Sequence, residues 1–193
     1  DEFSKLVEKA KKYIYDGDIF QVVLSRKFSF DASGDYLKVY EKLRSLNPSP
    51  YLYHLKMGKK ITIGSSPEML LRVTNDHVET FPIAGIRKIS NDEAKNEKLR
   101  QELVSDEKEL AEHTMLVDLG RNDIGRVCKY GTVHPESLMQ IKRFSHVQHI
   151  VSHVVGTLDS KNDMFDAFQA VFPAGTVSGA PKVRAMQIID ELE

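Results

Sequence analysis

The strongest constraint on this chain lies near its C-terminal end, where a loop of small residues runs directly into an amphipathic helix. The loop reads Phe172-Pro-Ala-Gly-Thr-Val-Ser-Gly-Ala-Pro-Lys182. Glycines let backbone N–H groups approach an anion closely, and the N-terminus of a helix adds a favourable dipole. Helical spacing predicts one buried face formed by Val183, Met186, Ile189 and Leu192. We therefore expect an anion-binding turn that is supported by a packed helix.

Apolar periodicity predicts how the rest of the chain is organised. Helices are expected at residues 3–14, 36–46, 90–119 with a break near Ser105, and 162–171. Strands are expected at 21–30, 51–57, 61–64, 69–73, 77–82, 125–129, 140–144 and 147–157. Most of these strands follow one another as hairpins and do not alternate with helices. This order favours an α+β fold with antiparallel sheets.

Charge and cysteine content exclude several classes of protein. The net charge is −1, so no global field would attract a nucleic acid or an acidic membrane. One cysteine, Cys128, excludes a disulfide within the chain. No apolar stretch reaches the length needed to span a bilayer. We expect a soluble cytoplasmic protein with no nucleic-acid or membrane partner.

The acidic segment 105–113 is the first candidate for chemistry. Glu109 and Glu112 are three residues apart, so on a helix their carboxylates share a face. Two oxygen donors on one face suit Mg²⁺, which keeps several waters and needs few protein ligands. Judged by spacing alone, a solvated acidic face near a helix start is the more common explanation.

Other polar groups are weaker candidates when each is taken alone. His146 and His149 would point to opposite sides of a strand, which argues against a two-histidine metal site there. Glu68, if buried, would suit general acid chemistry because its pKa would rise. Gly85 permits close approach of the backbone, and Arg87 could hold a carboxylate or pair at the surface.

Seven segments taken together resemble the chorismate-utilising enzymes, most closely the large subunits (component I) of the anthranilate synthases. The matching segments occur in family order and span nearly the whole chain. They are Gly17-Asp-Ile-Phe-Gln-Val-Val-Leu-Ser-Arg26, Asn47-Pro-Ser-Pro-Tyr51, Ser66-Pro-Glu68, Pro82-Ile-Ala-Gly85, Glu112-His-Thr-Met-Leu-Val-Asp118 with Arg121-Asn-Asp123, Ser145-His-Val-Gln-His149, and Phe172–Lys182. The resemblance implies the family fold, two packed and mostly antiparallel sheets with outer helices, here incomplete.

The resemblance also implies roles for individual residues. Glu112 would bind Mg²⁺, with Glu109 as a second ligand that acts directly or through water. Glu68 matches the general acid that protonates the departing ring hydroxyl. Ala84, Gly85 and Ile86 match the loop that contacts chorismate.

His149 and Thr176 match residues that line the ring, and His149 is expected to act when pyruvate leaves and the ring aromatises. The family has threonine where Ile86 stands, so only backbone N–H groups remain there for the substrate carboxylate.

Two positions distinguish members of the family by their nucleophile. Relatives that add water carry a lysine base where this chain has Gln21, and glutamine cannot act as a base. Aminodeoxychorismate synthases carry a nucleophilic lysine where this chain has Ala84. The resemblance therefore implies conversion of chorismate and ammonia to anthranilate and pyruvate, a lyase step of tryptophan biosynthesis, with ammonia supplied by a glutamine amidotransferase subunit. An aminodeoxyisochorismate synthase or another chorismate-utilising enzyme is the alternative.

The same resemblance bears on regulation and on chain length. Pro50, Tyr51 and Leu52 match one half of a tryptophan feedback site, although two prolines that end a helix also explain a turn by themselves. Residues 1–193 would form a partial catalytic domain, truncated at both ends, without the N-terminal regulatory part and the C-terminal half of the active site. An isolated chain of this kind would be inactive, and a non-catalytic partner-binding fragment is the other hypothesis.

Overall fold

The computed structural model describes residues 1–144 and 146–193, and these residues form two compact units. The first unit comprises residues 1–26 and 70–193, and the second comprises residues 27–69. Each unit is described by itself below. None of the helices in the described ranges has the length and apolar character needed to cross a membrane.

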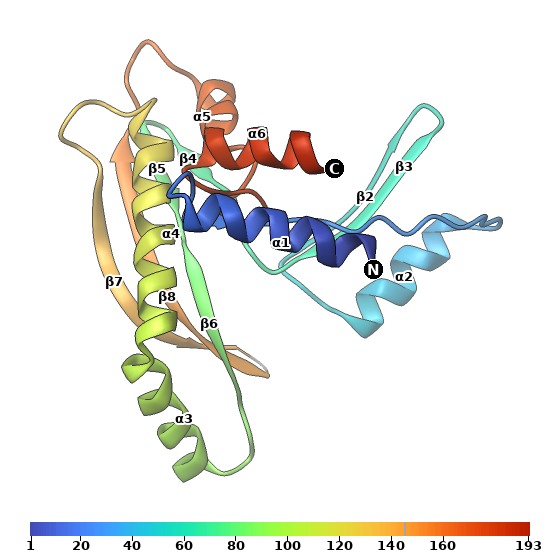
Figure 1. Ribbon diagram of the computed structural model, residues 1–193, viewed down its shortest axis with the longest axis horizontal. Coiled ribbons are helices and arrows are strands. Elements are labelled where there is room, and N and C mark those ends of the chain that lie inside the picture. Colours follow the sequence, from blue (N-terminus) through green and yellow to red (C-terminus); the bar gives the residue numbers. More distant parts are fainter. Residues whose placement is uncertain (145) are drawn as a thin grey trace. The chain divides into compact units, whose positions relative to one another are not determined.

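Helices and strands alternate irregularly along the chain (Figure 1). The helices are α1 (Glu2–Tyr15), α2 (Tyr36–Leu46), α3 (Glu93–Ser105), α4 (Glu107–Gly125), α5 (Met164–Val171), the short 3₁₀ helix η1 (Gly175–Val177) and α6 (Lys182–Leu192). The strands are β1 (Gln21–Val22), β2 (Tyr51–Met57), β3 (Lys60–Ser66), β4 (Arg72–Thr74), β5 (His77–Thr80), β6 (Ile83–Lys88), β7 (His134–Arg143), β8 (Val147–Thr157) and β9 (Gly179–Ala180). Every strand pairing is antiparallel.

Strand β8 organises the five-stranded sheet of the first unit. One edge of β8 pairs with β7, and its other edge pairs with β6 and then with β5. Strand β4 continues the sheet beyond β5. Seven of the eleven residues of β8 are buried and the other four are half-buried, and its sequence is rich in β-branched residues.

Helix α4 covers one face of this sheet and encloses the main core (Figure 1). Val78 of β5 and Val154 of β8 are fully buried in one cluster with Val117 and Ile124 of α4. Helix α5 adds Ala167, which completes the cluster from the same side. The sequence produces this packing because alternate residues of a strand face the same way, as do residues seven apart on a helix.

A second, smaller core joins the first helix to the last. Ile19, Ala185 and Ile188 are buried together, and Tyr13 Oη donates a hydrogen bond to Glu191 at 2.6 Å. Strand β1 pairs here with β9, whose first residue, Gly179, lies opposite Val22 and has φ +147°. A Cβ at residue 179 would lie 2.1 Å from the carbonyl oxygen of Gln21, so only glycine allows this pairing.

The second unit is a helix with a hairpin. Strands β2 and β3 pair along their full length, and α2 packs against both of them. Gly64 leaves the space that the Tyr53 ring occupies, because a Cβ there would lie 2.3 Å from that ring. The Tyr40 and His54 rings meet edge to face, with centroids 6.1 Å apart.

Most of the predicted elements are present, and three predictions are wrong. The expected strand at 21–30 contains only β1, since β9 offers a pairing partner to just two residues. The expected strand at 125–129 begins inside α4, and Cys128 makes only an isolated bridge to Leu158. On α6 the fully buried residues are Ala185 and Ile188, whereas Val183 is 69% exposed, because the helix packs on Ile19.

Candidate functional site

The N-terminal end of α4 gathers three charged side chains. The Asp106 carboxylate caps the helix by accepting from the backbone N–H groups of Lys108 and Glu109. Arg87 of β6 donates to Asp106 at 3.0 Å and to Glu109 Oε1 at 3.3 Å. These capping bonds, and then the Arg87 guanidinium, hold the pKa of Asp106 below its usual value. Arg87 therefore pairs with the protein's own carboxylates.

A β-bulge in β6 places Gly85 between α4 and β8. Residues 85 and 86 together oppose His149, because Ala84 pairs with Ile150 and Arg87 with Gln148. Gly85 has φ +65°, and a Cβ there would lie 3.2 Å from Glu109 Oε2 and 2.8 Å from the Leu103 side chain. The glycine thus keeps open the space beside one carboxylate oxygen of Glu109.

The same bulge fixes the ring of His149. His149 Nδ1 lies 2.7 Å from the carbonyl oxygen of Gly85, to which it must donate. A neutral ring in this tautomer carries its unprotonated lone pair on Nε2. Strand alternation points His149 away from Ile150 and Ser152, which face α4, so Gly85 has Glu109 on one side of the sheet and His149 on the other.

A cavity of about 1160 Å³ lies beside α4 in the first unit. Its lining residues are Phe20, Gln21, Lys108, Ala111, Glu112, Thr114, Met115, Val117, Asp118, Leu119, Arg121, Asn122, Pro135, Leu138, Met139, Ala180 and Pro181. The predicted site residues Gln21 and Glu112 thus share one cavity with the end of the glycine-rich loop. Within the described ranges, Glu112 makes no hydrogen bond or ion pair, whereas Arg121 pairs with Asp118 at 3.0 Å.

A buried ion pair ties the glycine-rich loop to the C-terminal end of α4. Lys182 Nζ lies 2.6 Å from Asp123 Oδ2 and also 2.6 Å from the carbonyl oxygen of Val171. Both charged side chains are only 10% exposed. Burial raises the pKa of Asp123, and the hydrogen bond from Lys182 opposes that rise. Between its two ends the loop also packs tightly, since a Cβ on Gly175 would lie 2.3 Å from Leu119.

The middle of α4 is anchored to β8 through a buried histidine. His113 is fully buried, and its Nε2 lies 2.6 Å from the Ser152 hydroxyl. Ser152 Oγ also accepts from the Met139 backbone N–H at 2.9 Å, so this hydroxyl bridges the imidazole and β7. Burial lowers the pKa of His113 to about 4. The imidazole is therefore neutral at physiological pH and joins α4, β8 and β7.

The carboxylates of Glu109 and Glu112 on α4 are chemically suited to bind a magnesium ion. Glu112 is a hard oxygen donor without a protein partner in the described ranges, and Glu109 keeps Oε2 beside the space at Gly85. Mg²⁺ binds through one or two carboxylates and keeps its remaining ligands as water. Glu109 Oε1 is already bonded to Arg87, so Oε2 is the oxygen that would face an ion or its water.

The predicted site residues divide between the two units. In the first unit, Ala84 is buried on β6, Ile86 is 56% exposed in the bulge, and Thr176 lies in η1. In the second unit, Glu68 follows β3, and its backbone N–H donates to Ser66 Oγ at 3.3 Å. There, Tyr51 and Leu52 begin β2 directly after Pro50, and they pair with Ser66 and Ser65.

Sequence reasoning did not identify the residues that hold this site together. Lys182 and Asp123 lie within two of the matching motifs, but their 59-residue separation gives no sign that they pair. Sequence reasoning assigns no role to His113. Its position next to Glu112 could have indicated one, because successive side chains on a helix point about 100° apart, and a neighbour of the cavity-facing Glu112 can point toward the sheet.

Comparison with known proteins relates this fold to one enzyme family. The sequence profile of the chorismate binding enzymes matches residues 1–193. Anthranilate synthase component 1 of Acetivibrio thermocellus is 58% identical over 193 residues, which are 100% of this chain and 39% of that protein.

Two solved structures extend the comparison to three dimensions. The crystal structure of anthranilate synthase component I from Streptococcus pneumoniae TIGR4 matches with a TM-score of 0.87 and 46% identity, over 100% of this chain and 42% of that one. The menaquinone-specific isochorismate synthase of Escherichia coli matches with a TM-score of 0.78 and 26% identity, over 100% and 45%. The chain thus spans less than half the length of these relatives.

Proposed function

Because this chain belongs to the chorismate binding enzyme family, we propose that it supplies part of the active site of an enzyme that converts chorismate and ammonia to anthranilate and pyruvate. The relatives named anthranilate synthase component 1 support this proposal at 52–58% identity. The activity belongs to the whole protein, of which chains like this one make up about two fifths in those relatives.

The observation that carries the proposal is Glu112, which opens into the cavity with Gln21 and has no protein partner in the described ranges. Glu109 Oε2 borders the space that a side chain at residue 85 would fill, and the Gly85 carbonyl orients His149. One helical turn further on, Glu112 opens into the cavity. Chorismate carries two carboxylates, so Glu112 alone would repel it, and a cation must lie between the two. Asp118 is already paired with Arg121, whereas Glu112 has no protein cation in the described ranges and therefore favours a metal-assisted site.

In this proposal Glu112 holds Mg²⁺, and Glu109 assists through Oε2 or through a water. The bound ion would stabilise negative charge on the ring carboxylate of the substrate. Lys108, which lines the same cavity, adds positive charge on the path of the dianion. The backbone at Gly85 and Ile86 contacts the substrate. The Ile86 side chain has no polar atom, so only backbone N–H groups can bind the substrate carboxylate there.

Proton transfers are assigned to two other residues. Glu68 protonates the hydroxyl that leaves the ring, as its place in the Ser66-Pro-Glu68 motif implies. His149 has Nε2 available to accept the ring proton when pyruvate departs, because Nδ1 is committed to the Gly85 carbonyl. Thr176 lines the ring from η1.

The choice of ammonia as nucleophile rests on Gln21 and Ala84. Gln21 lines the cavity with a carboxamide, which cannot remove a proton from water. Ala84 is buried and has no nucleophilic atom. Ammonia would come from a glutamine amidotransferase subunit, and Pro50, Tyr51 and Leu52 would contribute to feedback by tryptophan.

The test measures fluorescent anthranilate and pyruvate formed from chorismate, ammonium and Mg²⁺. The test compares two proteins: the chain of 193 residues, and a longer protein that contains this chain and has the full length of the relatives. We expect Mg²⁺-dependent product from the full-length protein and little from the chain alone. In the full-length protein, Glu112→Gln should lower turnover at least about 100-fold, since one bound carboxylate sets the metal affinity.

The matched control is Glu107→Gln, an exposed acid on the same helix, and it should retain activity. Unchanged Mg²⁺-dependent turnover in Glu112→Gln would refute the metal role. An aminated product without pyruvate would identify an aminodeoxyisochorismate synthase. No aminated product from the full-length protein would overturn the proposed activity.

A further inference from the structure

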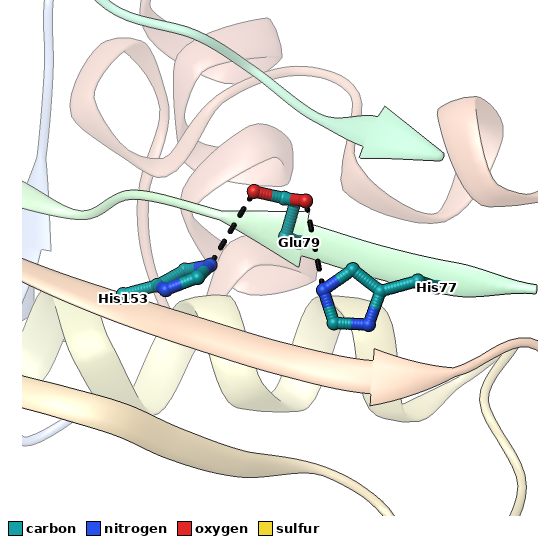
Figure 2. A group of neighbouring side chains, drawn as sticks. All are labelled: His77, Glu79 and His153. Atoms are coloured by element: carbon teal, nitrogen blue, oxygen red, sulfur yellow. Dashed lines mark ion pairs between the residues drawn. The ribbon is translucent and has the colours of Figure 1, made fainter. Parts of the chain in front are cut away.

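The sheet face away from α4 carries two histidines around a buried glutamate. His77 and Glu79 are two residues apart on β5 and therefore face the same way. Glu79 pairs across the sheet with Val155, two residues from His153 on β8, so His153 shares that face. Figure 2 shows both imidazoles directed at the Glu79 carboxylate. His153 thus joins a pair on β5 from a distant part of the sequence.

The atoms of this group lie at ligand-to-ligand distances. His77 Nε2 is 3.5 Å from Glu79 Oε2, and His153 Nε2 is 3.4 Å from Glu79 Oε1. One donor atom from each residue lies within 4.8 Å of the others. Two ligands bound to a tetrahedral zinc ion at ordinary bond lengths stand about 3.4 Å apart. The spacing therefore matches a site into which an ion could enter without moving the strands.

His153 is held as a metal-binding histidine usually is. Its Nδ1 lies 2.7 Å from Glu136 Oε2, so Nδ1–H donates to that carboxylate. The Phe81 ring stacks on the imidazole, with centroids 4.2 Å apart and an interplanar angle of 8°. Histidine ligands of metals typically donate their second N–H to a carboxylate in this way. In a neutral ring held this way, Nε2 is the atom that carries the lone pair.

The Nε2 atom of His153 has no hydrogen-bond partner among the described residues. It is buried, and it makes no hydrogen bond although Glu79 lies 3.4 Å away. An unprotonated imidazole nitrogen and a carboxylate oxygen are both acceptors, so their contact is unfavourable without a cation between them.

We propose that His77, Glu79 and His153 bind a divalent transition-metal ion of the zinc class. Two imidazoles with one carboxylate suit Zn²⁺ or Co²⁺, whereas Mg²⁺ prefers oxygen ligands and water. The site is separate from the α4 carboxylates and does not rest on the proposed activity. It ties β5 to β8 at the point where these strands pair.

The surroundings keep the carboxylate ready for an ion. Glu79 is 7% exposed, and a hydrogen bond from Arg72 on β4 lowers the pKa of its carboxyl group. Arg72 thus keeps the buried charge paired before a metal arrives. His77 is 48% exposed, which gives the ion a route from solvent and leaves a fourth position to water.

The test is Zn²⁺ binding to the untagged protein in excess Mg²⁺, measured by equilibrium dialysis, with Co²⁺ as a spectroscopic probe. We expect one Zn²⁺ per chain at this site and the visible absorption of four-coordinate Co²⁺. His77→Gln and His153→Gln should each weaken Zn²⁺ binding at least about tenfold. Glu136→Gln should weaken it about 10–100-fold by freeing the His153 ring.

The control is His134→Gln on β7, an exposed histidine outside the group, which should bind Zn²⁺ as the parent does. Zn²⁺ should also raise the melting temperature of the parent and of His134→Gln, but not that of His77→Gln. The proposal is overturned if the parent binds no Zn²⁺, if His134→Gln and His153→Gln lose equal affinity, or if Mg²⁺ displaces Zn²⁺ at equal concentration.

Discussion

Helix α4 carries acidic side chains toward both of its ends, and the two ends treat them differently. Near the C-terminal end, Asp123 is 10% exposed and lies 2.6 Å from Lys182. Near the N-terminal end, Glu112 opens into a cavity and has no hydrogen-bond or ion-pair partner in the described ranges. The same helix thus holds Asp123, whose charge is neutralised by Lys182, and Glu112, whose carboxylate remains available to a ligand.

The difference follows from the cost of burying charge. An unpaired buried carboxylate is strongly unfavourable, so a fold that buries Asp123 must supply a cation with it. An acid in a cavity remains hydrated and needs no partner until a ligand removes the water. The paired acid therefore secures the loop that ends at Lys182, and the unpaired acid is the one to examine for ligand binding.

The largest loss of stability is expected when the paired end is broken. Lys182→Met leaves Asp123 buried without a cation and should lower the free energy of unfolding by about 3–5 kcal/mol. Urea denaturation measures this loss. Arg121→Met, which breaks the exposed pair with Asp118, should cost less than about 1 kcal/mol.

A double variant tests whether the loss at Lys182 comes from the stranded charge. Combining Asp123→Asn with Lys182→Met should recover much of the lost stability, because no unpaired charge remains. Equal losses in Lys182→Met and Arg121→Met would contradict the contrast between buried and exposed pairs.

Between the two ends, His113 should make stability depend on pH. Its pKa is about 4 in the fold and 6.5 in the unfolded chain, so the unfolded chain binds the proton more readily. Keeping His113 neutral therefore costs no stability above pH 6.5. As the pH falls from 6.5 toward 4, the free energy of unfolding should decrease by about 3 kcal/mol in total.

Denaturation at a series of pH values measures this loss against a matched pair of variants. His113→Gln should remove that part of the pH dependence, and the exposed His134→Gln should retain it. If the His113→Gln profile kept the full slope between pH 6.5 and pH 4, another group would have to carry it.

A smaller loss is expected at the glycine beside the N-terminal end. Gly85→Ala forces an L-residue into φ +65° and places its Cβ 2.8 Å from Leu103. The backbone conformation alone costs about 1–2 kcal/mol. Gly58→Ala at φ +60° has nothing within 4 Å, so it carries the conformational cost without the crowding. Thermal melts of the two variants should differ, with Gly85→Ala the less stable; equal melting temperatures would show that the space beside Glu109 is not tightly enclosed.

The smallest change in stability is expected at the unpaired acid itself. Glu112→Gln removes a charge that no described residue neutralises, so the free energy of unfolding should change by less than about 0.5 kcal/mol. Its effect should appear in Mg²⁺-dependent turnover of the full-length protein. A loss comparable to that of Lys182→Met would place Glu112 in the scaffold.

Local pattern predicted much of this fold. Helix α2 and the break between α3 and α4 follow from spacing and capping residues, and β8 coincides with its predicted range. Strand β7 begins at His134, six residues before the predicted strand at 140–144. At Gly85 the sequence predicts only that the backbone can be approached closely. The β-bulge itself could not be predicted, because it depends on pairing with β8, which is distant in the sequence.

The site was less predictable than the fold for the same reason. Glu109 and Glu112 are close in sequence, so a helical spacing was enough to bring them together. His77 and His153 meet only because β5 pairs with β8 across a long separation. No periodicity within either segment contains that information, and sequence reasoning that argued against a histidine metal site considered only neighbouring histidines.

Strand β8 offers Ser152 to His113 on one face of the sheet and His153 to Glu79 on the other. Successive strand residues alternate in direction, so a slip of β8 by one residue would exchange the two. Both anchoring points would then be lost in a single step, since each face would receive the side chain meant for the other. Correct alignment of β8 is thus one all-or-none condition that the two faces share.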